Sequence, residues 1–115
     1  MDVHDMDYRY LASQGPALSQ INADALLVIL TGEHATTGCA ALDTVAKEAL
    51  GAKDWVLKAG KTLYVHRPAG VKAPRLVLVA AADASVKAFK AAVSKGLAEL
   101  KERGVAHVAV LTGAD

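Results

Sequence analysis

The stretch that decides the fold is Ala73-Pro74-Arg75-Leu76-Val77-Leu78-Val79-Ala80-Ala81-Ala82. Its apolar residues follow one another without polar alternation, which is typical of a strand buried on both faces of an α/β sheet. Pro74 has no N–H and disfavours helix just before the run, so it marks the start of the strand. Asp83 and Ser85 then offer oxygens that can cap a helix. We therefore predict a central strand over Arg75–Ala81, around which the chain is organised.

Other segments supply the partners of this strand. Further strands are predicted at Tyr8–Ala12 (an edge strand), Ala25–Leu30, Thr62–His66 and Val105–Leu111. Helical periodicity predicts one helix through Leu42, Val45, Ala46, Ala49 and Leu50, capped by Thr36 or Thr37 and stopped by Gly51. A second helix is predicted over Ala84–Arg103, and Gly96 inside it suggests close packing on the sheet. The strand at Arg75–Ala81, this helix and Val105–Leu111 form a βαβ unit, which makes the two strands parallel.

The length and composition limit what the chain can be. Its 115 residues form a single domain, 1–115, and its net charge is +1. Cys39 is the only cysteine, so no internal disulfide can form. No apolar run approaches the roughly 20 residues that span a bilayer, and Asp2, Asp5 and Asp7 give the N-terminus the wrong charge for a signal peptide. We expect a cytoplasmic protein that does not enter a membrane.

Charge is unevenly distributed along the chain. Residues 1–46 carry a net charge of −5, whereas residues 47–75 carry +5. A basic segment is most often a solvated face, but it can also contact phosphates. The possible nucleic-acid-binding residues are Lys53, Lys58, Lys61, Arg67, Lys72 and Arg75.

No catalytic or metal-binding residue is assigned. The four histidines, His4, His34, His66 and His107, lack ligand partners at helical metal-binding spacing. Cys39 has no basic partner and is interpreted as a packed thiol, and Trp55 as a partly buried anchor rather than a stacking platform for a base. The turn Ala80-Ala81-Ala82 lies where a phosphate loop would lie but lacks its glycines.

Several segments in order resemble the N-terminal domain of the leucyl (cytosol) aminopeptidase family. The matching pieces are Ala23-Asp24-Ala25-Leu26-Leu27-Val28, Ala41-Leu42-Asp43, Asp54-Trp55 with Gly60-Lys61-Thr62-Leu63, and Ala73-Pro74-Arg75-Leu76-Val77-Leu78-Val79. The resemblance implies a macro-like three-layer α/β domain, with a mixed, mostly parallel sheet flanked by helices. In the family this domain precedes a catalytic domain that holds two divalent metals, zinc or manganese, and the enzymes are homohexamers. No cofactor is expected in this segment, and whether the polypeptide is an enzyme depends on the missing catalytic domain.

Three functions are therefore compatible with the sequence. The first is the non-catalytic N-terminal domain of a leucyl aminopeptidase, acting in assembly and in access to the active sites. The second is a stand-alone macro-like module that binds ADP-ribose, because Asn22–Val28 resembles the start of the macrodomain pattern with Asp24 at the adenine-contacting position; the ligand residues expected after Val28 are missing. The third is an accessory domain that binds DNA weakly through its basic segment.

Overall fold

The computed structural model describes residues 7–10, 18, 20–32, 36–101 and 103–112. They form a five-stranded sheet with the order β1-β5-β2-β4-β3. The strands are β1 (Asp7–Tyr10), β2 (Ala25–Leu30), β3 (Thr62–His66), β4 (Arg75–Ala80) and β5 (His107–Thr112). The four strands β1, β5, β2 and β4 are parallel, and β3 pairs antiparallel with β4 at one edge. The predicted α/β class with a mixed, mostly parallel sheet is confirmed.

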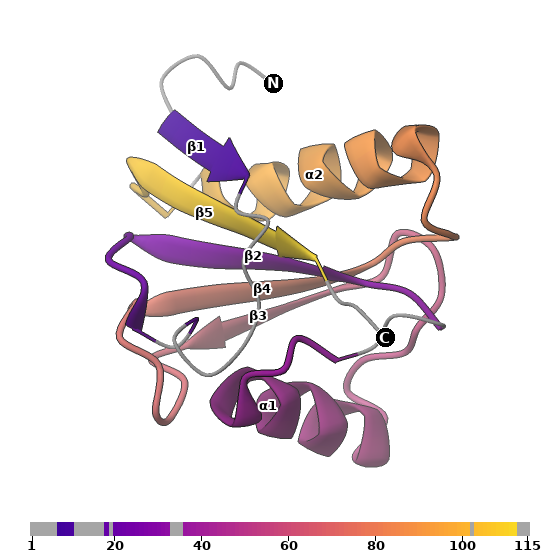
Figure 1. The fold of residues 1–115 in the computed structure, drawn as a ribbon, viewed down its shortest axis with the longest axis horizontal. Coiled ribbons are helices and arrows are strands. Elements are labelled where there is room, and N and C mark those ends of the chain that lie inside the picture. The colour runs from indigo at the N-terminus through magenta and orange to yellow at the C-terminus, as the bar shows by residue number, and fades with distance from the viewer. Residues whose placement is uncertain (1–6, 11–17, 19, 33–35, 102, 113–115) are drawn as a thin grey trace.

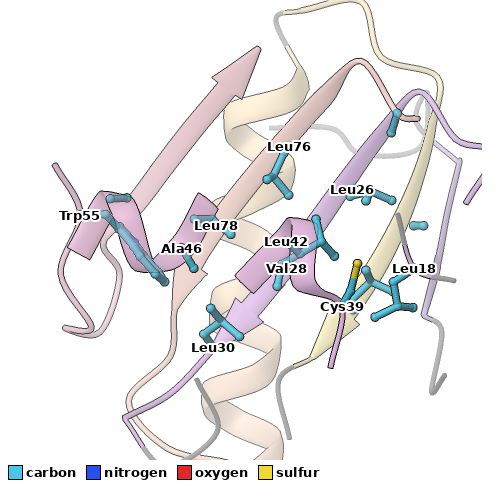
Figure 2. Packing of buried hydrophobic residues seen from close by; sticks show 14 of the residues in the cluster. Leu18, Leu26, Val28, Leu30, Cys39, Leu42, Ala46, Trp55, Leu76 and Leu78 are labelled. Atoms are coloured by element: carbon cyan, nitrogen blue, oxygen red, sulfur yellow. The ribbon is translucent and has the colours of Figure 1, made fainter. Parts of the chain in front are cut away.

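The two helices, α1 (Ala40–Gly51) and α2 (Val86–Lys101), lie on opposite faces of the sheet (Figure 1). Alternate residues of each interior strand point to one helix or the other, because side chains alternate along a strand. On the α1 face, Leu26 and Val28 of β2 pack with Leu42 and Ala46, as Figure 2 shows. On the α2 face, the core contains Ala25, Leu27, Val77, Val79, Leu97 and Leu100. The domain therefore has three layers.

The strand predicted to be central lies one position from the centre of the sheet. The middle position belongs to β2, which is buried along all six of its residues, and β4 lies between β2 and the edge strand β3. Both β2 and β4 carry apolar residues on both faces. This pattern predicts that a strand is interior, but it does not predict the place of that strand in the order of the sheet. The predicted βαβ unit joins β4 to β5, and both are parallel to β2, which lies between them.

The helix ends differ in part from the predicted ones. Cys39, not Thr36 or Thr37, is the N-cap of α1, and it makes no side-chain capping bond. Thr37 instead donates its N–H and hydroxyl to Asp43 at 2.7 and 2.9 Å, while its Oγ1 accepts the Cys39 N–H at 3.1 Å. Gly51 belongs to α1, and the left-handed residue after this helix is Lys53, with φ of 61°.

At α2 the prediction holds better. Ser85 Oγ accepts the Ala88 N–H at 3.2 Å, and Asp83 Oδ1 accepts the Ser85 N–H at 2.8 Å. Ser85 is therefore confirmed as a cap of α2, whereas Asp83 bonds to the N–H of Ser85 just before the helix. The helix covers Val86–Lys101, slightly less than the predicted Ala84–Arg103.

The bounds of β1 and β5 also differ slightly from the predicted ones. β1 is the predicted edge strand; of its predicted range, Leu11 and Ala12 lie outside the described residues. β5 begins at His107 rather than at Val105. The reason is that the Asp24 carboxylate accepts the N–H groups of Ala106 and His107, so the chain before His107 bonds to a side chain instead of a neighbouring strand.

Candidate functional site

A cavity of about 360 Å³ lies at the carboxyl edge of the parallel strands. Its lining residues come from the ends of β2 and β5 and from the start of α2: Ile29, Thr31, Asp83, Ala84, Val86, Phe89 and Thr112. The helices that follow β2 and β4 leave toward opposite faces of the sheet. Ligands of open α/β sheets bind at this kind of switch point, outside the carboxyl ends of the strands. We refer to this cavity as the carboxyl-edge pocket.

The charge at this pocket is negative. Hydrogen bonds from the side chain and the backbone N–H of Ser85 hold the pKa of the Asp83 carboxyl below its usual value, so this side chain stays ionised. It lies beside the N-terminus of α2, where a bound phosphate would otherwise be favoured. The Ser85 side chain in turn caps the Ala88 N–H. The pocket therefore suits an apolar group with a nearby N–H or cation, and it disfavours an anion.

Asp24 directly precedes β2, at the end of the sheet opposite to the carboxyl-edge pocket. Its Oδ2 accepts the N–H groups of Ala106 at 3.1 Å and His107 at 2.9 Å, and its own N–H donates to the His107 carbonyl at 2.9 Å. The N–H of His107 and then that of Ala106 lower the pKa of the Asp24 carboxyl. The six residues of β2, roughly 20 Å, separate Asp24 from the carboxyl-edge pocket. In this geometry Asp24 joins β2 to β5 and does not line that pocket.

The six basic residues singled out in the sequence fall into separate places. Lys58 and Lys61 share a turn, in which the Lys61 N–H donates to the Lys58 carbonyl at 3.0 Å, and Lys53 follows α1. Arg67 and Arg75 lie at the other end of β3, where His66 pairs with Arg75 and the Arg67 N–H donates to the Pro74 carbonyl at 2.7 Å. Lys72 lies in the loop between them. The five residues of β3, about 16 Å, separate the two ends.

Two surfaces were missed by sequence reasoning. The first is a groove of about 830 Å³ between α1 and β3, whose lining includes Val45, Leu63 and Val65. The second is a polar and aromatic cluster that joins α2 to the edge strand β3. No periodic pattern could have revealed either, because each depends on which helix lies beside the edge strand.

The cluster on β3 ties the edge strand to the helix. The Arg103 guanidinium lies 3.9 Å from the Tyr64 ring centroid, and its Nη1 is 3.5 Å from Glu99 Oε2. Glu99 Oε1 accepts the Thr62 hydroxyl at 3.0 Å, and the Tyr64 hydroxyl is 3.2 Å from His66 Nδ1. β3 is an edge strand and pairs only with β4, so these contacts to α2 and Arg103 stabilise it further.

The remaining candidates are structural. Trp55 is 2% exposed and donates its Nε1–H to the Lys61 carbonyl at 3.0 Å, which confirms the anchor interpretation. Cys39 is 1% exposed and packs with Leu18 and Leu42, as predicted for a packed thiol (Figure 2). Of the four histidines, His4 and His34 lie outside the described residues.

No group of three or more His, Cys, Asp or Glu side chains in the described part of the chain is placed to hold a metal ion. No helix in the described ranges is long and apolar enough to cross a bilayer.

The chain is similar to proteins named probable cytosol aminopeptidase. The protein from Methylibium petroleiphilum is 49% identical over 106 residues, which cover 91% of this chain and 22% of that protein. The one from Polaromonas naphthalenivorans is 35% identical over 106 residues, covering 92% of this chain and 21% of that protein. The chain thus spans about a fifth of the length of these relatives. No protein-family profile matches it.

Proposed function

We propose, on the premise that this chain corresponds to the N-terminal region of the cytosol aminopeptidases, that it is the non-catalytic N-terminal domain of such an enzyme. The parent would be a leucyl aminopeptidase that removes N-terminal residues from peptides. The observation that carries the proposal is the 49% identity that extends over 91% of this chain but over only 22% of the relative. Identity at that level along one contiguous region is what a shared domain of a longer polypeptide produces.

The proposal assigns the chemistry to the rest of the polypeptide. Two-metal hydrolysis needs several ligand side chains that converge on ions about 3.5–4 Å apart. Within the described residues no three candidate ligands converge, so none of them fits such a pair of ions. The two divalent metals, zinc or manganese, would be held by a C-terminal catalytic domain, and no step of the reaction is routed through residues of this chain.

The role that we propose for the domain is interaction. It would support a homohexamer in the cytoplasm and shape access to the active sites, on a macro-like fold. The three-layer arrangement with an antiparallel edge strand is compatible with that fold. The groove between α1 and β3 includes apolar residues in its lining, and exposed apolar surface is the kind on which domains and subunits pack. Weak DNA contact through the basic residues at the two ends of β3 is a subsidiary part of the same proposal.

The experiment compares the 115-residue chain with the full-length protein. Each is incubated with a leucine anilide in the presence of zinc or manganese, and release of the chromogenic amine is followed. We expect turnover by the full-length protein that chelation abolishes, and none by the chain alone. Turnover by the repurified chain that scales with protein and is lost on chelation would overturn the assignment of the chemistry. An inactive full-length protein, with metal supplied, would overturn the assignment of the parent.

A further inference from the structure

We propose that the carboxyl-edge pocket is the seat of an apolar side chain from the polypeptide that follows Asp115 in the full-length protein. This inference rests on the proposed function, because it requires a longer chain. Three features of the pocket lead to it: its exposed apolar wall, the place where β5 ends, and the charge of Asp83.

The wall of the pocket exposes apolar surface that α2 leaves uncovered. Val86, in the first turn of α2, is 70% exposed, and Phe89 lies one turn further along the same helix and is only half-buried. Both line the pocket together with Ile29, which belongs to the core on the α2 face. Among the described residues, the other exposed large apolar side chain is Val56, which is 42% exposed and does not line this pocket. Apolar groups gathered around a cavity, unlike a single exposed valine, mark a surface that binds something.

The end of β5 places the continuing chain at this pocket. Thr112 is the last residue of β5 and is itself part of the lining. The relatives are about four times as long as this chain and match it at their N-terminal region, so in them a long polypeptide continues from this position. Segments that are consecutive in sequence usually pack beside one another, because connections are short. The segment that leaves β5 therefore starts beside the wall formed by Val86 and Phe89.

Asp83 selects the kind of group that enters. Its ionised carboxylate belongs to the lining, between the end of β4 and the start of α2, and disfavours phosphates and carboxylates. Thr31 and Thr112 are the other polar residues of the lining. An apolar side chain would pack on the apolar part of the lining. A backbone N–H or a basic group next to it would face the carboxylate of Asp83. A pocket volume of about 360 Å³ has room for one or two such side chains.

The test measures how fast a thiol reagent labels cysteines in the full-length protein. Val86→Cys and Val56→Cys are made in a Cys39→Ala background, because both valines are exposed in this domain and Cys39 is not. We expect Val86→Cys to react at least about tenfold more slowly than Val56→Cys in the native protein, and at the same rate in denaturant. If Val86→Cys prevents folding, Ala84→Cys reports on the same wall.

Each outcome bears on the inference. Equal native rates for the two cysteines would overturn it. Protection of Val86→Cys that disappears on dilution would assign the pocket to a second copy of the protein and would also overturn it. Peptidase activity is assayed on the same preparations. Loss of activity together with a protected Val86→Cys would count against the proposed function alone, whereas full activity with an unprotected Val86→Cys would count against this inference alone.

Discussion

Gly96 of α2 lies so close to Leu27 of β2 that a Cβ atom added at Gly96 would stand 2.1 Å from Leu27 Cδ1 and 2.8 Å from Leu27 Cδ2. Leu27 is fully buried among the core residues on the α2 face. It therefore has little room to turn away. The glycine costs the helix up to about 1 kcal/mol relative to alanine, and what it gains is this close approach of helix and sheet.

We predict that Gly96→Ala destabilises the protein although alanine is the better helix former. The added methyl group forces Leu27 or the whole of α2 to shift, and overpacking of this kind costs about 1–3 kcal/mol. Chemical denaturation followed by circular dichroism measures the change. Gly51→Ala is the matched control, because nothing lies within 4 Å of a Cβ at Gly51. We expect it to be neutral or slightly stabilising, and a Gly96→Ala protein as stable as that control would contradict the packing.

The close packing of α2 at Gly96 and the positions of the strands could both be predicted from the sequence, for the same physical reason. Buried positions require apolar or small residues. A contiguous apolar run and a glycine inside an amphipathic helix therefore both indicate burial. The order of the strands cannot be predicted in this way, since β2 and β4 are both apolar and buried over five or more residues and only the tertiary fold gives β2 the centre of the sheet. The predicted N-cap of α1 was wrong because the Thr37 hydroxyl donates to the carboxylate of Asp43, six residues away.

The candidate site was harder to predict than the fold. Asp83 and Ser85 were predicted as caps, and Asp83 lines the carboxyl-edge pocket. The remaining lining comes from three separate elements, and the contact of Arg103 with Tyr64 joins residues 39 positions apart. Such sites depend on long-range geometry, which local periodicity does not encode.

Asp24 provides a prediction that depends on pH. Because its pKa is lower in the folded protein than the ordinary aspartate value, its contribution to stability is present above the ordinary value and is lost as the pH falls through the folded pKa. Asp24→Ala removes the acceptor of the Ala106 and His107 N–H groups, and we expect a loss of about 0.5–2 kcal/mol at neutral pH, the range for similar side-chain caps. Thermal melts between pH 2 and 7 measure it.

The control for Asp24 keeps the shape and removes the charge. Asp24→Asn retains one acceptor oxygen, so we expect a smaller loss at neutral pH and a weaker fall of stability in acid than in the wild type. Asp54→Asn, in an exposed loop, is the comparison for a general effect of removing one negative charge. If Asp24→Ala and Asp54→Asn behave alike at every pH, the carboxylate does not hold the start of β5.

ADP-ribose should not bind to this domain. The Asp83 carboxylate and the Ser85 hydroxyl already occupy the first turn of α2, and Asp24 is engaged with β5 at the other edge of the sheet. A pyrophosphate would meet a negative charge where it needs donors. Calorimetry at about 100 μM protein detects a Kd tighter than about 1 mM. A saturable heat with the wild type would contradict this prediction, and its increase in Asp83→Asn would identify the pocket as the place of binding.

DNA binding, if the basic segment acts as proposed, should be weak, independent of sequence and steeply dependent on salt. The two ends of β3 present Lys58 with Lys61 and Arg67 with Lys72 as separate groups, so each would neutralise its own phosphates. We expect the double variants Lys58→Gln/Lys61→Gln and Arg67→Gln/Lys72→Gln each to weaken binding, and each to reduce the salt slope by up to about 2, since each phosphate contact contributes about 0.9. Fluorescence anisotropy with two unrelated duplexes between 50 and 200 mM salt measures both quantities.

The matched control for DNA binding removes the same charge elsewhere. Lys87 and Lys90 are exposed on α2 and belong to neither of the two β3 groups, and Lys87→Gln/Lys90→Gln lowers the net charge by the same two units. If this variant weakens binding as much as the two β3 variants do, the attraction is a property of the total charge and the six basic residues form no site. Binding that does not change with salt would exclude phosphate contacts as its cause, because released counterions must appear in the slope. The absence of binding at 50 mM salt would remove DNA from the partners of this domain.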